Sequence, residues 1–502
     1  MENMSFSRVW SGQIISLKAD IISVEVDLSR GLHFFSIIGL SNTLVDEAKD
    51  RVSSALKNSN FSSPKHSNEK VIVSLSPPYI KKDGTAFDLA IAIAYLNTKK
   101  IIRQPCGTDL FLGELSLDGL VKKTRGILSI VIKAKENGFK NIFIPKDNEN
   151  EVKYISDINI YSVKNLNEVV RHLNGEKDII PVQILEYKIE PSTKNSEYLF
   201  ENIYGLDHAK RGLEIAIAGK HSIALWGRAG IGKTLLAKSS SSIIPPLNLE
   251  ESIEVTSIHS LLNNTEDLVS RPPFRSPHHS SSYSAIIGGG ANITPGEITL
   301  AHRGILFMDE FLEFDRRVIN SLREPLEEKC INIARASSRA SLPADIVLII
   351  AMNPCPCGYH GANIPNKKCV CEPKRIENYR NKLSGPILDR IDMWIEINST
   401  DIEKILPKND VGTKGSAEIR KSIDVMKDII RARELICKNK DTELSKDIQE
   451  IIKEAVNIMN ISTRGIKSIK KLSRTIASLD NSDIIKREHV LEALDYRIKK
   501  DF

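Results

Sequence analysis

Hydrophobic positions in the first 175 residues follow two different periods. Three short apolar runs have the length and composition of β-strands: Ile21–Val26, Val71–Leu75 and Asn141–Ile144. Three longer stretches repeat apolar residues every three or four positions, as helices do: 44–56, 87–96 and 128–137. Strands that alternate with helices predict an α/β domain, which we place at residues 1–175.

A polar linker and a second α/β block follow. Residues 176–199 contain two prolines and a Lys/Glu-rich stretch, so we expect a linker there. Within 200–400, three apolar runs predict buried strands: Ser222–Trp226, Gly304–Met308 and Ile346–Ala351. Their alternation with helical patterns predicts a parallel sheet covered on both faces. Helical periodicity dominates 401–502, where we expect an all-helical lid domain.

Length and charge leave most classes of soluble protein open. The 502 residues carry a formal net charge of +6, because 70 basic residues nearly balance 64 acidic ones. This balance neither requires nor excludes a nucleic-acid partner. The sequence shows neither a signal-peptide pattern nor an apolar run near the roughly 18 residues that span a bilayer. We therefore expect a soluble cytoplasmic protein that does not act at a membrane.

A glycine-rich loop lies directly between the predicted strand Ser222–Trp226 and a helical pattern. Its sequence, Gly-Arg-Ala-Gly-Ile-Gly-Lys-Thr, has the spacing of a phosphate-binding loop. Glycines let the backbone wrap so that successive N–H groups and the helix N-terminus converge on phosphate oxygens. The lysine neutralises the β- and γ-phosphates, and the threonine offers its hydroxyl to Mg²⁺. We expect eight residues to bind ATP: Gly227, Arg228, Ala229, Gly230, Ile231, Gly232, Lys233 and Thr234.

Two carboxylates follow the predicted strand that ends at Met308. We expect Asp309 to hold Mg²⁺ together with Thr234, and Glu310 to orient and polarise the attacking water. A phosphate-binding loop alone is compatible with a kinase, whereas the paired carboxylates favour hydrolysis. The alternative is an ordinary strand followed by a solvated acidic turn. The pattern predicts an Mg²⁺-dependent ATP hydrolase.

Several long and uncommon strings occur together along the chain. They are Arg271-Pro-Pro-Phe-Arg-Ser-Pro-His-His279, Gly288-Gly-Gly290, Pro295-Gly-Glu-Ile-Thr-Leu-Ala-His302, Leu322-Arg-Glu-Pro-Leu-Glu327 and Met352-Asn-Pro-Cys-Pro-Cys-Gly358. Together they resemble the magnesium-chelatase-like AAA+ proteins of the ComM/YifB type, over nearly the whole chain. The resemblance implies a ring-forming homo-oligomer, expected to be a hexamer. It also implies helicase or branch-migration activity on DNA during natural transformation.

The same resemblance assigns roles to three further residues. Asn353 resembles the first sensor of AAA+ ATPases, which helps to position the lytic water. Arg390 lies in a segment that resembles the one supplying an arginine to a neighbouring subunit's γ-phosphate. Arg464 resembles the second sensor, which reaches the phosphates from the lid. The alternatives are a turn for Asn353, a salt bridge to Asp389 or Asp392 for Arg390, and a surface arginine near a helix N-cap for Arg464.

The N-terminal block resembles the Lon-protease-like domain of the same proteins, which implies a ribosomal S5 domain 2-like fold. Ala86 stands where the nucleophilic serine of such a domain would fall, and Leu128 stands where its lysine partner would be. Nucleophilic catalysis needs an activatable hydroxyl and a nearby base, and neither side chain provides one. We therefore expect no peptidase activity.

Two segments of the middle block are candidates for contact with DNA. Residues Ile331–Pro343 predict a β-hairpin that carries Arg335 and Arg339 near its tip and resembles the pre-sensor hairpin of the minichromosome-maintenance helicases. Each arginine can make one salt-dependent phosphate contact without reading bases. The alternative is a solvated basic hairpin. The resemblance also favours a substrate-contact role in the ring pore for Arg271–His279, for which a solvated loop is the alternative.

Four of the seven cysteines lie between positions 355 and 371. Cys355 and Cys357 form one close pair, and Cys369 and Cys371 form another. Four thiolates in two near pairs can form a tetrahedral Zn²⁺ site, and the bound ion would stabilise the structure of an insertion after the first sensor. The alternatives are buried or redox-active cysteines, or a site in which His360 replaces one thiolate.

Three functions stay open at this point. The first is an ATP-driven ring motor that moves DNA strands as a helicase or branch-migration factor in transformation or recombination, with Arg390 completing the neighbouring subunit's site. The second is a chelatase-like ATPase that remodels a protein or metal-insertion partner. The third is a regulatory module whose Lon-like domain captures peptides. The charges of Arg335 and Arg339 favour the first.

Overall fold

The structure, a computed structural model, describes residues 6–15, 18–32, 34–40, 42–64, 69–78, 82, 86–189, 198–262, 267–290, 293–334, 339–361, 368–397, 420–439 and 444–497. The chain forms two compact units. One consists of Met1–Lys188 with Ser252–Val269, and the other consists of Ile189–Glu251 with Ser270–Phe502. The domain limits expected at residues 175, 200 and 400 stay predictions.

The N-terminal unit is built on a mixed seven-stranded sheet in the order β3-β4-β2-β1-β5-β8-β9. Its antiparallel centre joins β1 to β2 and β2 to β4, while β3, β5, β8 and β9 add in parallel. The strands are β1 (Phe6–Ile15), β2 (Lys18–Arg30), β3 (Phe34–Ile38), β4 (Glu69–Ser76), β5 (Asp109–Phe111), β8 (Asn141–Pro145) and β9 (Asn159–Val163). A small separate ladder pairs β6 (Glu114–Leu115) with β7 (Val121–Lys122).

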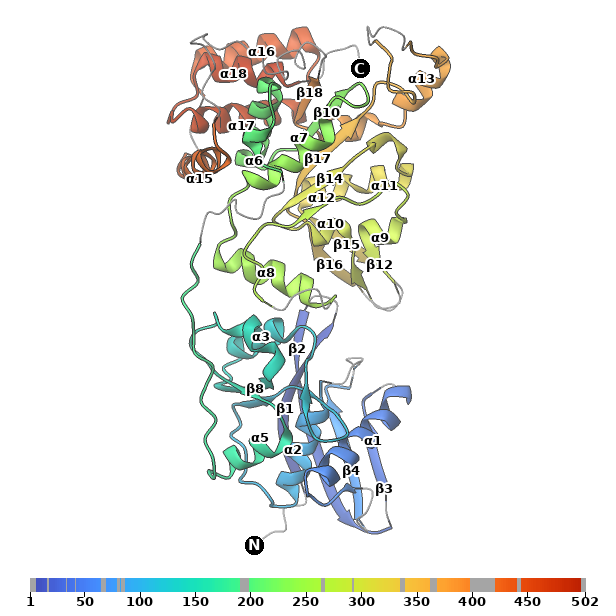
Figure 1. Ribbon diagram of the computed structural model, residues 1–502, viewed down its shortest axis with the longest axis vertical. Coiled ribbons are helices and arrows are strands. Elements are labelled where there is room, and N and C mark those ends of the chain that lie inside the picture. The colour runs from blue at the N-terminus through green and yellow to red at the C-terminus, as the bar shows by residue number, and fades with distance from the viewer. Residues whose placement is uncertain are drawn as a thin grey trace. The chain divides into compact units, whose positions relative to one another are not determined.

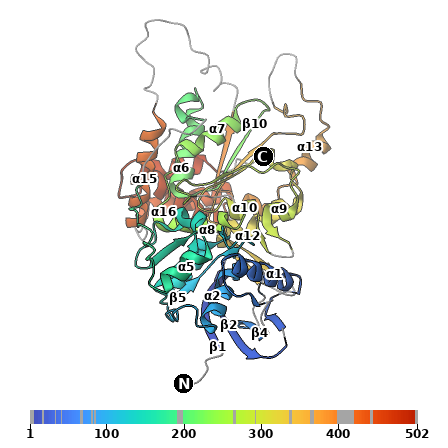
Figure 2. The same ribbon diagram turned by 60° about the horizontal axis from the view of Figure 1, so that its bottom comes forward.

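Helices cover both faces of this sheet. They are α1 (Asn42–Asn58), α2 (Asp88–Thr98), α3 (Ile127–Glu136), α4 (Glu149–Val152) and α5 (Leu166–Leu173). Figure 2 shows α1 and α2 beside the sheet, and their apolar side chains share a core with Val9 of β1. On the other face, Gly12 of β1 leaves room for α3, because a Cβ there would lie 2.4 Å from Ile130. Residues on the two faces of β1 thus pack against different helices.

The second unit contains an all-parallel five-stranded sheet in the order β11-β14-β17-β10-β18. The strands are β11 (Phe274–Arg275), β14 (Ile305–Met308), β17 (Val347–Met352), β10 (Ile223–Gly227) and β18 (Met393–Ile397). Strands β14 and β17 are buried along their whole length, as expected of a parallel sheet with two covered faces. The prediction of a buried parallel sheet is confirmed.

Shorter elements surround this sheet. The helices are α6 (Asp207–Gly219), α7 (Lys233–Ser239), α9 (Tyr283–Ile287), α10 (Glu297–Leu300), α11 (Arg316–Ser321), α12 (Arg323–Glu328), α13 (Pro373–Arg380) and α14 (Gly385–Leu388). Helix α8 (Leu249–Ser260) belongs to the other unit from Ser252 onward. Two hairpins project from the connections, β12 (Gly288–Gly289) with β13 (Thr294–Pro295) and β15 (Cys330–Ala334) with β16 (Arg339–Pro343). The predicted hairpin at 331–343 is therefore confirmed.

The C-terminal segment of the second unit is helical, as its periodicity predicted. Its helices, drawn in red in Figure 1, are α15 (Ser422–Lys438), α16 (Lys446–Met459), α17 (Thr463–Leu479) and α18 (Arg487–Asp495). Helices α15 and α17 pack on α6, and their apolar side chains join one continuous core with the parallel sheet. The function of this C-terminal segment as a lid stays a proposal. Among the described helices, none combines the length and the apolar character that crossing a membrane requires.

Candidate active site

The glycine-rich loop connects the carboxyl end of β10 to the start of α7, as the sequence predicted. Gly230 and Gly232 have φ angles of +76° and +95°, a left-handed conformation that side chains with a Cβ disfavour. Gly232 is the N-cap of α7, so Lys233 is the first residue of the helix. Backbone N–H groups at this helix end are free to point toward an anion.

Parallel strands bring the other predicted residues to the same edge. Strand β17 lies between β10 and β14, and all three run in the same direction. Asp309 and Glu310 follow β14 directly, and Asn353 follows β17. The carboxyl ends of the three strands therefore meet beside the loop, although the residues lie far apart in the sequence.

Lys233 is buried at the centre of this edge. Its Nζ donates to the carbonyl oxygens of Gly227 at 2.7 Å and Arg228 at 2.9 Å, and to Oδ1 of Asn353 at 3.0 Å. Burial lowers the pKa of Lys233 to about 8, while the nearby charges of Asp309 and Glu310 oppose that shift. The amine is thus held by neutral oxygens within reach of two carboxylates.

Thr234 and Asp309 form a pair of oxygen donors next to Lys233. The Thr234 hydroxyl donates to Oδ2 of Asp309 at 2.6 Å, and the other oxygen of Asp309 accepts the backbone N–H of Glu310 at 2.9 Å. Mg²⁺ prefers hard oxygen ligands and is usually held by one or two protein groups together with phosphates and water. The donor set of Thr234 and Asp309 therefore fits Mg²⁺.

Glu310 has a neighbour that the sequence did not predict. Its backbone is left-handed, with φ of +50°, and its side chain is half exposed. Oε2 of Glu310 lies 3.2 Å from Nδ1 of His279, whose ring also lies against that of His278. The substrate-contact role of Arg271–His279 stays a prediction, and the structure places His279 beside the second carboxylate of the site.

Arg390 and Arg464 meet at one carboxylate. Both guanidinium groups form ion pairs with Glu327 of α12, and Arg390 also donates to the carbonyl oxygen of Pro386 at 2.6 Å. The suggested partners for Arg390, Asp389 and Asp392, are not its ion-pair partner here. The structure brings the two arginines together, which their separate motifs did not predict.

These arginines lie at the opposite edge of the sheet from the phosphate-binding loop. Arg390 precedes β18 by three residues, and β18 runs parallel to β10, with Met393 beside Ile223 and Ile397 beside Gly227. A five-residue strand spans roughly 16 Å, which is more than an arginine side chain covers. A broad cleft between the sheet and the C-terminal helices is lined by Glu327, Arg390 and Arg464.

Asp392 anchors the C-terminal helices beside this cleft. Its carboxylate accepts the backbone N–H of Ser222 at 3.1 Å and the hydroxyl of Ser468 on α17, and it lies 3.7 Å from the His221 ring. Burial raises the pKa of Asp392, but its contacts with His221, Ser468 and Ser222 dominate and hold it at about 2. The carboxylate thus links the amino ends of β10 and β18 to α17.

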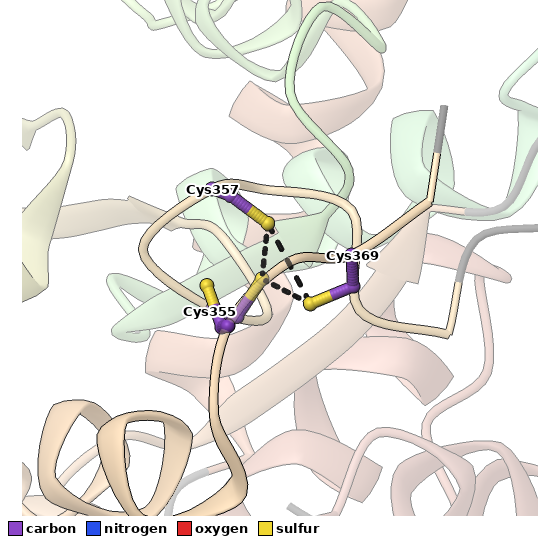
Figure 3. A group of neighbouring side chains, drawn as sticks. Cys355, Cys357 and Cys369 are labelled. Atoms are coloured by element: carbon purple, nitrogen blue, oxygen red, sulfur yellow. Dashed lines mark hydrogen bonds between the residues drawn. The ribbon is translucent and has the colours of Figure 1, made fainter. Parts of the chain in front are cut away.

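Four cysteines gather between β17 and α13. The Sγ atoms of Cys355, Cys357 and Cys369 lie 3.3–3.7 Å apart (Figure 3). With Cys371, all four sulfurs lie within 4.8 Å of one another. A tetrahedral Zn²⁺ with Zn–S bonds of about 2.3 Å separates its sulfurs by about 3.8 Å. None of these four cysteines forms a disulfide. The cluster therefore fits a tetrahedral metal ion, and His360 contributes its backbone N–H to Cys355 at 3.3 Å.

The two predicted DNA-binding arginines belong to the β15–β16 hairpin. Arg335 lies outside the described residues, and for Arg339 only the backbone is described, opposite Ala334 in the hairpin register. The backbone of Arg339 thus lies at the end of the hairpin pairing, as predicted, while the placement of Arg335 and the contact of both arginines with DNA stay predictions.

The N-terminal unit buries the two positions that were compared with Lon-type residues. Ala86 and Leu128 are both buried and apolar. Nearby, Asp88 bonds Arg51 at 2.8 Å; burial raises the pKa of Asp88 to about 6 despite the favourable charge of Arg51. The absence of peptidase activity stays a prediction.

Three family profiles match successive parts of the chain. Residues 199–405 match magnesium chelatase, subunit ChlI; residues 24–148 match subunit ChlI of Mg-chelatase; and residues 414–497 match the C-terminal part of magnesium chelatase subunit ChlI. The matched ranges cover elements of both compact units.

Several curated proteins are similar to this chain. The competence protein ComM of Haemophilus influenzae is 36% identical over 515 residues, covering 98% of each chain. The uncharacterized protein YifB of Escherichia coli is 36% identical over 512 residues, covering 98% of this chain and 97% of YifB. The maternal DNA replication licensing factor mcm6 of Xenopus tropicalis is 24% identical over 371 residues, covering 66% of this chain and 41% of that protein. The chain therefore belongs to the magnesium-chelatase-like AAA+ family, together with ComM and YifB.

Proposed function

We propose that the protein hydrolyses ATP at the carboxyl edge of the parallel sheet and uses the energy to move DNA strands as a ring-shaped homo-oligomer. Two hydrogen bonds beside the phosphate-binding loop carry the ATPase proposal: Lys233 donates to Asn353, and Thr234 donates to Asp309. Three strand ends supply these groups, so the geometry does not depend on one flexible loop.

Each residue has a distinct task in this proposal. Lys233 neutralises the β- and γ-phosphates, and the backbone N–H groups of the loop bind phosphate oxygens. Thr234 and Asp309 would hold Mg²⁺, which would neutralise the negative charge that develops on the phosphates. Glu310 orients and polarises the attacking water, and Asn353 helps to position it.

Arg390 completes the site of a neighbouring copy. Within one chain it lies at the amino edge of the sheet, where it pairs with Glu327, while the phosphate-binding loop lies at the carboxyl edge. An arginine that stabilises γ-phosphate charge therefore has to come from another subunit, and such an arginine contributes about 10³–10⁵ to the rate. We extend this role to Arg464 because it shares Glu327. Both arginines then act across a subunit interface, in a ring that we expect to be a hexamer.

DNA is the proposed substrate of the motor. Arg339 begins β16 at the end of the hairpin pairing, and Arg335 directly follows β15 in the sequence. Arginines at a hairpin tip suit phosphate contacts. The names of two relatives refer to competence and to DNA replication. We therefore favour helicase or branch-migration activity in transformation or recombination over remodelling of a protein or metal-insertion partner.

Three structural assignments complete the proposal. The four-cysteine cluster, whose sulfurs lie close enough to share one metal ion, holds a structural Zn²⁺. The N-terminal unit has a Lon-like fold without peptidase chemistry, and the helices after residue 420 act as the lid of the ATPase.

The test compares ATP hydrolysis by the wild-type protein and the Glu310→Gln variant, each without DNA, with single-stranded DNA and with branched DNA. We expect DNA to stimulate the wild type and Glu310→Gln to abolish turnover while leaving ATP binding intact. Replacing Arg335 and Arg339 together by alanine should remove the stimulation and spare basal hydrolysis. Wild-type turnover that is indifferent to every DNA form would contradict the motor proposal but not the ATPase proposal.

A further inference from the structure

The turn that carries Cys355 and Cys357 touches the phosphate-binding loop directly. The backbone N–H of Gly358 donates to the carbonyl oxygen of Cys355 at 2.9 Å, which closes the turn. The carbonyl oxygen of Gly358 in turn accepts the backbone N–H of Ala229 at 3.3 Å. The turn that carries these two cysteines is thus hydrogen-bonded to the phosphate-binding loop.

Gly358 is the residue that permits this approach. Its φ of +82° is left-handed, and a Cβ at this position would lie 2.9 Å from the Cβ of Ala229. Both the backbone conformation and the lack of space therefore exclude a side chain. The turn is shaped to fit against Ala229.

A second contact flanks the cluster on its other side. Asn353, two residues before Cys355, accepts the hydrogen bond from Nζ of Lys233 at 3.0 Å. The segment from Asn353 to Gly358 consequently contacts the loop at both ends, through Lys233 and through Ala229, and the first pair of cysteines lies between these contacts.

The sulfurs are arranged to hold this segment in place. Cys369 and Cys371 come from the far end of the connection, just before α13, and their sulfurs complete the cluster. Backbone N–H groups also bond the sulfurs: His360 bonds Cys355, and Tyr359 and Val370 bond Cys357. Such N–H contacts stabilise metal-bound thiolates and orient them. An ion here joins both ends of the connection as a short crosslink.

We propose that Cys355, Cys357, Cys369 and Cys371 bind one Zn²⁺ and that the bound ion braces the phosphate-binding loop through Gly358 and Asn353. This inference rests on nucleotide binding at Lys233, as proposed above, and adds a control on that site: loss of zinc releases the turn and weakens nucleotide binding. The four thiolates favour Zn²⁺ over harder ions, which prefer oxygen ligands.

The test measures zinc content and nucleotide affinity separately. Wild-type protein purified without chelator should contain about one zinc per chain. Cys369→Ser should lose the zinc and bind a fluorescent ATP analogue about tenfold more weakly, whereas Cys106→Ser, which replaces an exposed cysteine outside the cluster, should keep both properties. Removing zinc from the wild type with a chelator and adding it back should lower and restore nucleotide affinity, which covers the case in which Cys369→Ser fails to fold.

Two further variants separate the brace from the nucleotide site itself. Gly358→Ala should keep its zinc, because all four cysteines remain, and lose nucleotide affinity, because the added Cβ collides with Ala229. Lys233→Ala should also keep its zinc; if it binds the nucleotide as the wild type does, the proposed ATP site fails. A purified protein without stoichiometric zinc, or with iron in its place, overturns the metal assignment. Folded zinc-free protein with wild-type nucleotide affinity overturns the brace.

Discussion

Glu327 forms an ion pair with Arg390, a residue 63 positions further along the chain. The same carboxylate also pairs with Arg464 of α17. One acidic side chain on α12 thereby orients two arginines that enter the cleft from different elements, and it offsets part of their mutual repulsion.

Replacing Glu327 with glutamine should therefore impair hydrolysis without impairing nucleotide binding. The arginines lose their common partner, and misplacement of such groups by about 1 Å can cost about a hundredfold in rate. We expect kcat to fall about ten- to a hundredfold, with an unchanged Kd for nucleotide, because Glu327 lies at the sheet edge away from Lys233. Steady-state kinetics and titration with a fluorescent ATP analogue check both values. Glu328→Gln serves as the matched control, and equal kcat for both variants would refute the positioning role.

The lowered pKa of Lys233 predicts a pH-dependent nucleotide affinity. Phosphate binding favours the charged amine, and burial makes the free site lose its proton near pH 8. Affinity should therefore be constant below about pH 7.5 and weaken above pH 8, by up to about tenfold per pH unit. Nucleotide phosphates are already ionised there, since their second pKa is about 6. Titrations from pH 7 to 9.5 measure the effect, and a flat profile would argue against this environment for Lys233.

His279 should act as a positioning residue for Glu310. Its ring nitrogen lies 3.2 Å from Oε2 of the carboxylate, so it can hold the carboxylate in the orientation that the attacking water requires. His279→Ala should lower kcat about tenfold with little change in nucleotide affinity. His279→Asn, which retains a donor, should recover part of the rate. His278→Asn is the control, and an unaltered kcat for His279→Ala would exclude the role.

Asp392 should stabilise the fold of the second unit in its ionised form. Its folded-state pKa of about 2 lies below the ordinary value of about 4, so its contribution is complete above pH 4 and is lost as the pH falls toward 2. Asp392→Asn should lower the free energy of unfolding by about 1–3 kcal/mol at neutral pH, because Ser222 and Ser468 lose a charged acceptor.

Denaturant unfolding of the wild type, Asp392→Asn and the neighbouring control Asp389→Asn checks this expectation between pH 7 and pH 3. The difference between the wild type and Asp392→Asn should shrink as the pH falls. A difference that is independent of pH would show that ionisation of Asp392 does not contribute.

Features that depend on neighbouring residues were predictable from the sequence. The glycine spacing up to Lys233 specifies a tight loop between a strand and a helix, and the apolar run before Asp309 specifies a buried strand. The β15–β16 hairpin follows from local alternation in the same way. In the N-terminal unit, predicted segments fall within β2, β4 and β8, whereas β1 was missed because small and polar residues interrupt its apolar side chains.

Contacts between distant segments were not predictable in this way. The pairing of Arg464 with Glu327 joins residues 137 positions apart, and the contacts of His279 with Glu310 and of Gly358 with Ala229 depend on how parallel strand ends meet. The pattern of apolar residues within one segment carries no information about contacts with a distant segment. The available signal was that His279, Glu327 and Gly358 all lie in the uncommon strings that resemble the family.

The most direct measurement of the central claim mixes two inactive variants. Lys233→Ala lacks the phosphate contact but keeps Arg390, while Arg390→Ala keeps an intact phosphate-binding loop. If the active site lies between two copies of the chain, each variant alone should be nearly inactive. An equimolar mixture should then regain activity at about a quarter of the interfaces, those that join one intact half-site from each variant. A mixture as inactive as its components, or wild-type hydrolysis by Arg390→Ala alone, would contradict a site shared between subunits.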